Sequence, residues 1–255
     1  MTDHAALLDL CHRIGNSDID LALSAEGNVS TRGDDEFMTI KATGCSLATM
    51  TASDLVDVRR STLMALLDSD PSDDDVHAAY LEAKRDSADK KASVEAILHA
   101  VLYELTDAQV VAHTHPIAVN AIGCSRNPEI LVQGALFPDA IVMMGRRQLL
   151  VPYVDPGVPL ARAVRDAVTG FIGEEGSSPR VIYLANHGLF VLTGTEVEAW
   201  ELTRMVVKNA RVLLGTMVAG GPNFLSRANV DRIDKRPDEI YRRQLLRHEN
   251  GDSDD

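Results

Sequence analysis

The stretch Val110-Val111-Ala112-His113-Thr114-His115-Pro116 is the most informative part of the sequence for both the fold and the site. An apolar run leads into two histidines separated by one residue. Side chains alternate along a strand, so a short strand here would place both imidazoles on one face. Two imidazoles on one face can occupy adjacent corners of a tetrahedral metal site. Taken alone, the pair is explained equally well as two surface histidines at a strand end.

A third histidine lies between two more apolar segments. Val181–Leu184 and Leu189–Leu192 are expected to be strands joined through Asn186-His187-Gly188, where the glycine permits a tight backbone. Three histidines from two strand ends, with one coordination position left open, are the usual arrangement of a catalytic zinc. We therefore predict a site for Zn²⁺, with Mn²⁺ or Co²⁺ as alternatives, formed by His113, His115 and His187.

The segment before the histidine pair, Ala92–Leu105, has apolar residues at helical spacing and is expected to be a helix. Glu95 falls in its first turn, where a carboxylate also interacts favourably with the helix dipole. We predict Glu95 as the catalytic acid/base, a role that favours a pKa raised toward the working pH. His99 lies four residues further on the same face, as a weaker metal candidate or a packed histidine.

Two turn-like clusters precede this helix. Gly27-Asn28-Val29-Ser30 consists largely of turn-forming residues. Lys41-Ala42-Thr43-Gly44 follows a β-like run and supplies a cation, a hydroxyl and a flexible amide. A glycine-containing turn with exposed N–H groups can cradle an anion, so both clusters are candidate phosphate-binding loops.

The remaining elements follow from periodicity. Helices are expected at His4–Asn16, after Pro116, and from the capping box at Thr195 to about Leu214; strands at Phe37–Ala42, Leu55–Arg59 and Gln109–His113; and a solvated loop at Asp68–Asp75. Strands alternate with helices, and several strands are close enough in sequence to pair antiparallel. This order predicts a mixed sheet covered by helices.

Composition limits the classes of partner. The 255 residues suit a single domain spanning 1–255, in which about residues 235–255 form a partly flexible C-terminal tail. The net charge of −13 disfavours nucleic acid and anionic lipid, and no apolar run is long enough to span a bilayer. The three cysteines, Cys11, Cys45 and Cys124, are widely spaced, which indicates free thiols and a cytoplasmic location.

Taken in order, five short motifs resemble those of the class II aldolase/adducin family. They are Gly27-Asn28-Val29-Ser30, Thr43-Gly44, Ser93-Val94-Glu95, His113-Thr114-His115-Pro116 and Asn186-His187-Gly188. The ordered set is specific, although each piece alone is not. The family includes fuculose-phosphate and rhamnulose-phosphate aldolases, ribulose-phosphate 4-epimerases, related decarboxylases and dehydratases, and non-catalytic adducin heads. The form of the serine and glycine motifs looks closest to the rhamnulose-phosphate aldolase domain of longer bifunctional enzymes.

The resemblance implies an α/β fold, with three α/β/α layers around a central mixed, mostly antiparallel sheet, and a homotetramer with active sites near subunit interfaces. It implies that the three histidines bind zinc and that Glu95 is the catalytic glutamate. It also implies a phosphate site formed by Asn28, Thr43, Gly44 and Ser93. We expect Lys41 to add a cation to this site. Val94 stands where the family has a second serine, and Tyr241 has no motif that assigns it a role.

These expectations combine into a metal-dependent lyase that cleaves a ketose 1-phosphate by retro-aldol chemistry through a zinc-stabilised enediolate. An epimerase, decarboxylase or dehydratase acting on a sugar phosphate could use the same metal site. The alternative from a different class is an adducin-like binding module without metal. The three histidines together with Glu95 favour an enzyme, because a binding module has little need of that set.

Overall fold

The computed structural model describes residues 4–34, 36–239 and 241, and a single sheet forms the centre of this part of the chain. Its strands are β1 (Asn28–Arg32), β2 (Phe37–Lys41), β3 (Leu55–Arg59), β4 (Val110–Thr114), β5 (Leu149–Val151), β6 (Val181–Leu184) and β7 (Gly188–Thr193). The strand order is β3-β2-β1-β4-β7-β6-β5. Every neighbouring pair is antiparallel except β5 and β6, which are parallel.

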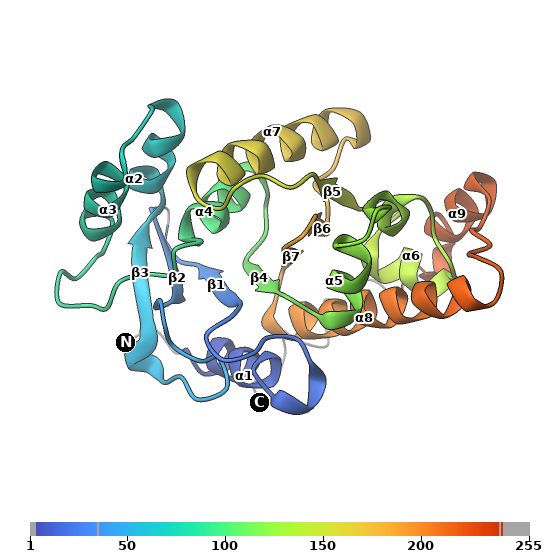
Figure 1. Ribbon diagram of the computed structural model, residues 1–255, viewed down its shortest axis with the longest axis horizontal. Coiled ribbons are helices and arrows are strands. Elements are labelled where there is room, and N and C mark those ends of the chain that lie inside the picture. Colours follow the sequence, from blue (N-terminus) through green and yellow to red (C-terminus); the bar gives the residue numbers. More distant parts are fainter. Residues whose placement is uncertain (1–3, 35, 240, 242–255) are drawn as a thin grey trace.

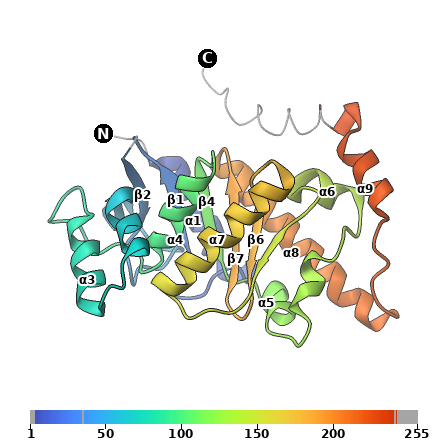
Figure 2. The same ribbon diagram turned by 90° about the horizontal axis from the view of Figure 1, so that it is seen from above.

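Helices cover both faces of the sheet (Figure 1). They are α1 (Ala5–Ile14), α2 (Arg60–Met64), α3 (Asp73–Glu82), α4 (Ala96–Leu105), α5 (Ile117–Gly123), α6 (Pro138–Met144), α7 (Val158–Glu175), α8 (Glu196–Val218) and α9 (Arg227–Asp234). Helices α2, α4 and α7 pack on one face, and α1, α5, α6 and α8 on the other. Figure 2 shows α4 and α7 lying over the strands, with α3 and α9 at opposite ends of the molecule.

Two apolar layers hold the sheet, one on each face. In β4, Val111 packs into the layer beneath α4 and α7, whereas Val110 and Ala112 pack into the layer against α1 and α8. Burial of both faces explains why this strand is a continuous apolar run instead of an alternating one. The expected three-layer α/β/α fold with a mixed, mostly antiparallel sheet is confirmed.

Several local expectations differ from the structure. Gly27-Asn28-Val29-Ser30 is not a simple turn, because Asn28 begins β1, which pairs with β2 and β4. Helix α4 begins at Ala96, so Glu95 is its N-cap residue and not part of its first turn. Within the expected acidic loop, Ser72 forms a capping box with Asp75 and starts α3. Most of the expected tail, about residues 235–255, lies outside the described residues.

Antiparallel pairing brings the chemically distinctive segments to one end of the sheet. The start of β1 lies beside the end of β4, since Asn28 pairs with His113. The end of β4 also lies beside the start of β7, which follows the His187 turn. The end of β2, at Lys41, reaches the same end of the sheet, where its carbonyl accepts from the amide of Ser93, shortly before α4 begins. Among the described residues, no helix combines the length and hydropathy needed to cross a bilayer.

The three free cysteines differ sharply in exposure, which predicts their order of alkylation. Cys124 is exposed and Cys45 partly exposed, whereas Cys11 is buried in α1, where burial raises the pKa of its thiol to about 12. Because the thiolate is the reactive form, iodoacetamide at about pH 8 should modify Cys124 first and Cys11 only after unfolding. Peptide mapping by mass spectrometry measures the order. Equal rates for Cys11 and Cys124 in native protein would contradict the packing of α1.

Candidate metal and acid–base site

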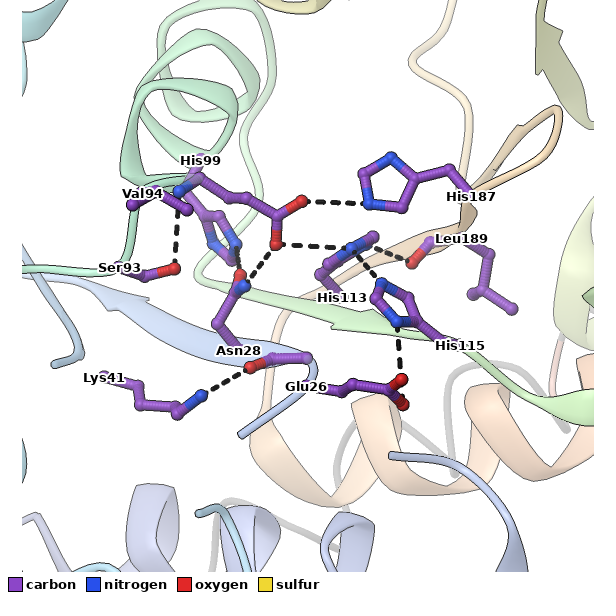
Figure 3. Close-up of polar contacts among 12 residues, drawn as sticks. Glu26, Asn28, Lys41, Ser93, Val94, His99, His113, His115, His187 and Leu189 are labelled. Atoms are coloured by element: carbon purple, nitrogen blue, oxygen red, sulfur yellow. Dashed lines mark hydrogen bonds and ion pairs between the residues drawn. The ribbon is translucent and has the colours of Figure 1, made fainter. Parts of the chain in front are cut away.

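The three predicted histidines converge at the end of β4 (Figure 3). One ligand nitrogen from each of His113, His115 and His187 lies within 4.8 Å of the other two. The Nε2 atoms of His113 and His115 are 2.9 Å apart. Tetrahedral zinc with Zn–N bonds of about 2.0–2.1 Å places its nitrogens roughly 3.4 Å apart, so this donor set fits such an ion after small side-chain adjustments.

His113 is held in the orientation that a metal ligand requires. Its ring is fully buried and stacks on Phe190, with ring centroids 4.3 Å apart. Its Nδ1 lies 2.9 Å from the carbonyl oxygen of Leu189, which can only accept a hydrogen bond. Nδ1 therefore carries the proton, and the lone pair of Nε2 is directed into the site. A backbone carbonyl on the second nitrogen is the usual way in which proteins fix a ligating imidazole.

His187 comes from the tight turn that joins β6 to β7. Asn186 has a φ of 57°, and the amide of Asn120 in α5 donates to the backbone carbonyl of His187 at 3.0 Å. The glycine is needed for a different reason from the one expected. Gly188 does not have a positive φ, but a Cβ there would lie 2.5 Å from the Thr114 carbonyl oxygen and 2.6 Å from Cδ2 of His115.

Gly188→Ala is therefore expected to destabilise the protein and weaken metal binding together. The added methyl group must displace both the backbone of β4 and the His115 ring, and overpacking of this kind typically costs about 1–3 kcal/mol. Urea unfolding and titration with Co²⁺ measure the two effects. Gly170→Ala is the matched control, because that helical glycine has open space around its Cβ position. Normal cobalt affinity in Gly188→Ala would show that the close contact does not constrain the site.

Glu95 lies between two of the histidines. Its Oε1 is 3.0 Å from Nε2 of His187, and its Oε2 is 3.4 Å from Nε2 of His113. Asn28 donates from Nδ2 to Oε2 of the same carboxylate at 2.6 Å. The close approach of three polar partners places the carboxylate at the edge of the proposed metal position.

The electrostatics of Glu95 differ from the expected raised pKa. Burial acts to raise the pKa of the carboxyl group, but the adjacent imidazoles of His113 and His187 outweigh burial and lower it strongly. A cation held by the same imidazoles acts in the same direction. Glu95 is therefore an ionised carboxylate, the form that accepts a proton.

His99 is not placed to bind the metal. Its Nε2 contacts Oδ1 of Asn28, and its Nδ1 lies 2.6 Å from Oγ of Ser30, so both ring nitrogens are already hydrogen-bonded. The ring is fully buried, and burial lowers the pKa of His99 to about 3. His99 is thus a neutral, packed histidine, and the metal alternative for it is not supported.

Lys41 has a role different from the predicted phosphate contact. Its side chain is buried, and its Nζ donates to the backbone carbonyls of Ala25 and Gly27 at 2.7 and 2.9 Å. The ammonium thus stabilises the loop that leads into β1. Because two backbone carbonyls already accept from its ammonium group, Lys41 is left out of the phosphate contacts proposed below.

The other predicted phosphate-site residues do lie together. The segment after β2 runs antiparallel to the residues before α4: the amide of Thr43 donates to the Lys91 carbonyl at 2.9 Å, and that of Ser93 to the Lys41 carbonyl at 3.0 Å. Thr43 and Gly44 are exposed, and Gly44 has a φ of 76°. The backbone N–H of Glu95 donates to Oγ of Ser93 at 3.3 Å, which joins this turn to the acid–base site.

Two residues near the site carry no sequence signal. Glu26 places Oε2 3.7 Å from Nδ1 of His115, and Asn120 supports the His187 turn from α5. Neither belongs to a recognisable motif, because a surface loop and a short helix bring them to the site only in the folded chain.

Comparisons with known proteins identify the family and the fold. Residues 5–214 match the family described as Class II Aldolase and Adducin N-terminal domain, and the chain belongs to this family. The fold resembles that of an L-fuculose 1-phosphate aldolase, with a TM-score of 0.69 and 17% identity over 92% of this chain and 97% of that one. It also resembles YgbL of Escherichia coli, a putative aldolase/epimerase/decarboxylase, with a TM-score of 0.67 and 20% identity over 90% and 98%.

One curated relative is much longer than this chain. The uncharacterized oxidoreductase YuxG of Bacillus subtilis strain 168 is 27% identical over 177 residues. The match covers 69% of this chain but only 23% of the relative. The activity of that longer protein therefore gives no direct assignment for the site described here.

Proposed function

We propose that this protein is a divalent-metal-dependent carbon–carbon lyase that cleaves a ketose 1-phosphate by a retro-aldol reaction. One observation carries the proposal: three imidazoles converge to within 4.8 Å, and the Glu95 carboxylate lies 3.0 Å from one of them. The donor set suits zinc, with manganese or cobalt as alternatives. Family membership supports an enzyme of this type.

The proposed chemistry divides between the ion and Glu95. A metal bound by the three imidazoles would act as a Lewis acid toward the substrate carbonyl. In cleavage, the bond between C3 and C4 breaks, the C4 hydroxyl loses its proton as the aldehyde forms, and C3 gains a proton. Glu95, ionised at rest, would accept the C4 hydroxyl proton as the aldehyde forms and pass it to C3, and in the reverse direction it would remove this proton from C3 of dihydroxyacetone phosphate.

The phosphate group would bind at the turn beside Glu95. Thr43 offers a hydroxyl, Gly44 an exposed amide and Ser93 a second hydroxyl, and a free N–H of Asn28 lies nearby. Such a local site is needed because the chain has a net charge of −13. Val94 stands where the family has a second serine; it carries no hydroxyl and is 62% exposed. Ser93 would therefore supply the hydroxyl of this pair of positions alone.

The same site could support an epimerase, decarboxylase or dehydratase, because these reactions share a proton transfer beside a carbonyl. The name given to YgbL includes epimerase and decarboxylase, which supports reactions of this kind as the second candidate. A binding module without metal is the alternative from another class. Purified protein that contains no divalent metal and binds none on titration would favour the module.

Two measurements test the assignment in order. Elemental analysis should find about one zinc, manganese or cobalt ion per subunit. NMR should then show cleavage of fuculose 1-phosphate, rhamnulose 1-phosphate or another ketose 1-phosphate to dihydroxyacetone phosphate and an aldehyde. Conversion of ribulose 5-phosphate to its epimer, or of an acid-sugar phosphate to a decarboxylated product, would replace the aldolase proposal. Light scattering tests the homotetramer that the family resemblance implies.

A further inference from the structure

A buried line of side chains runs from the interior of the fold to Glu95. Helix α4 contributes His99 and Tyr103, which follow Glu95 at four-residue spacing on one helix face. Strand β1 contributes Asn28 and Ser30, which lie on the strand face that meets α4. Figure 3 shows Asn28 beside His99, and the amide of Asn28 also donates to the Glu95 carboxylate. The line is therefore assembled from a helix and a strand that both begin at the proposed site.

Each neighbouring pair in this line is hydrogen-bonded. The hydroxyls of Tyr103 and Ser30 are 2.8 Å apart, and Oγ of Ser30 is 2.6 Å from Nδ1 of His99. Nε2 of His99 contacts Oδ1 of Asn28, whose Nδ2 donates to Glu95 at 2.6 Å. The four supporting side chains are all buried. Bulk water therefore has little access to replace any of these contacts.

The placement of the Asn28 amide fixes the direction of all these bonds. Its Nδ2 lies 2.6 Å from Oε2 of Glu95 and can only donate, whereas its Oδ1 faces Nε2 of His99 and can only accept. Nε2 of His99 must then carry the proton, and Nδ1 must accept from the Ser30 hydroxyl.

We propose that His99 is a positioning residue: its neutral Nε2–H tautomer, set by Ser30 and Tyr103, locks the amide of Asn28 so that it holds the Glu95 carboxylate in place. This inference rests on the proposed acid–base role of Glu95. Asn28 would then orient Glu95 in addition to its proposed place in the phosphate site. The buried polar residues His99, Ser30 and Tyr103 would in turn orient Asn28. Buried polar groups of this kind specify one arrangement only when every member is hydrogen-bonded.

The first test is the tautomer of His99, read directly by NMR of ¹⁵N-histidine-labelled full-length protein. We expect a protonated Nε2 and an unprotonated Nδ1, with the signal assigned by its loss in His99→Gln. In Ser30→Ala, where Nδ1 loses its donor, the Nδ1–H form should increase. A protonated Nδ1 in the wild-type protein would overturn the proposed direction of the line. This readout needs neither substrate nor turnover.

The second test compares two replacements of His99. His99→Gln keeps an amide N–H₂ that can donate to Asn28, whereas His99→Phe fills a similar space without a donor. With the ketose 1-phosphate that the wild type cleaves fastest, His99→Phe should lower kcat about 10- to 100-fold, the range typical of supporting residues. The cobalt stoichiometry should stay unchanged, and His99→Gln should recover most of the turnover.

The outcomes separate this inference from the proposed function. An active enzyme in which His99→Phe and His99→Gln have equal kcat values would overturn the positioning role while the lyase assignment stands. Protein without lyase activity but with the Nε2–H tautomer would reject the lyase assignment while the hydrogen-bonded line stands. Thr203→Val is the control, because this buried hydroxyl in α8 donates to the Ala199 carbonyl of its own helix. If His99→Phe fails to fold, Ser30→Ala carries the kinetic test, and unchanged kcat there would overturn the role.

Discussion

Glu95→Gln is expected to lower turnover by about 10²- to 10⁴-fold, the usual contribution of a positioned acid–base group, while the protein keeps its metal. Glutamine preserves the shape of the side chain and can still accept from Asn28, but it cannot take a proton. The carboxylate is not among the three nitrogen ligands, so metal content should not fall. The loss should therefore appear in kcat with little change in metal stoichiometry.

The most direct measurement does not require the aldehyde substrate to be known. In D₂O, the wild type should exchange one C–H proton of dihydroxyacetone phosphate, and Glu95→Gln should lose this exchange. Glu104→Gln is the matched control, since this exposed glutamate lies on the same helix, remote from the histidines. Exchange at the wild-type rate in Glu95→Gln would remove Glu95 from the proton transfer.

The histidine site could be predicted because its signals are local. Strand alternation places His113 and His115 together, and the two apolar strands around His187 mark it as a turn residue directed toward the end of the sheet. The apolar run before His113 also indicated a short strand, which the structure confirms as β4. What the sequence could not supply was the distance between these segments, which depends on β4 pairing with β7.

Other features depended on contacts between distant segments. Asn28 and Ser30 have the propensities of turn residues, yet pairing with β2 and β4 makes them part of a strand. Lys41 resembled an anion-binding cation, but the buried position of its side chain directs it to two backbone carbonyls. Nothing in the local sequence around Lys41 indicates which of these roles it takes.

The direction of the pKa shift of Glu95 also could not be predicted from the sequence. From sequence, a buried catalytic carboxyl group suggests a raised pKa, whereas two adjacent imidazoles lower it. By contrast, the line behind Glu95 did leave a sequence signal. Glu95, His99 and Tyr103 recur every fourth residue, and Asn28 and Ser30 every second, which are the periods of one helix face and one strand face. The pattern is interpretable only once both elements are known to pack together.

His113→Ala is expected to remove the metal and, with it, all metal-dependent activity. His113 is the fully buried member of the triad, and its Nδ1 bond to Leu189 orients it before any ion binds. Two imidazoles would remain, and one preorganised ligand would be gone. The dissociation constant for Zn²⁺ should therefore rise by at least about 100-fold, above the 10- to 100-fold typical of outer-shell changes.

Zinc per subunit in purified protein, and the Tm with and without added Zn²⁺, measure this effect. A ligand that binds only the folded state raises its stability in proportion to the logarithm of ligand concentration over Kd, so wild type should gain Tm with zinc and His113→Ala should not. His77→Ala is the control, because His77 lies exposed on α3 and contacts Lys91, not the triad. Full zinc occupancy together with a zinc-dependent Tm in His113→Ala would exclude His113 as a ligand. The remaining His115 and His187 could not then form the proposed three-nitrogen site, and the lyase assignment built on it would fail.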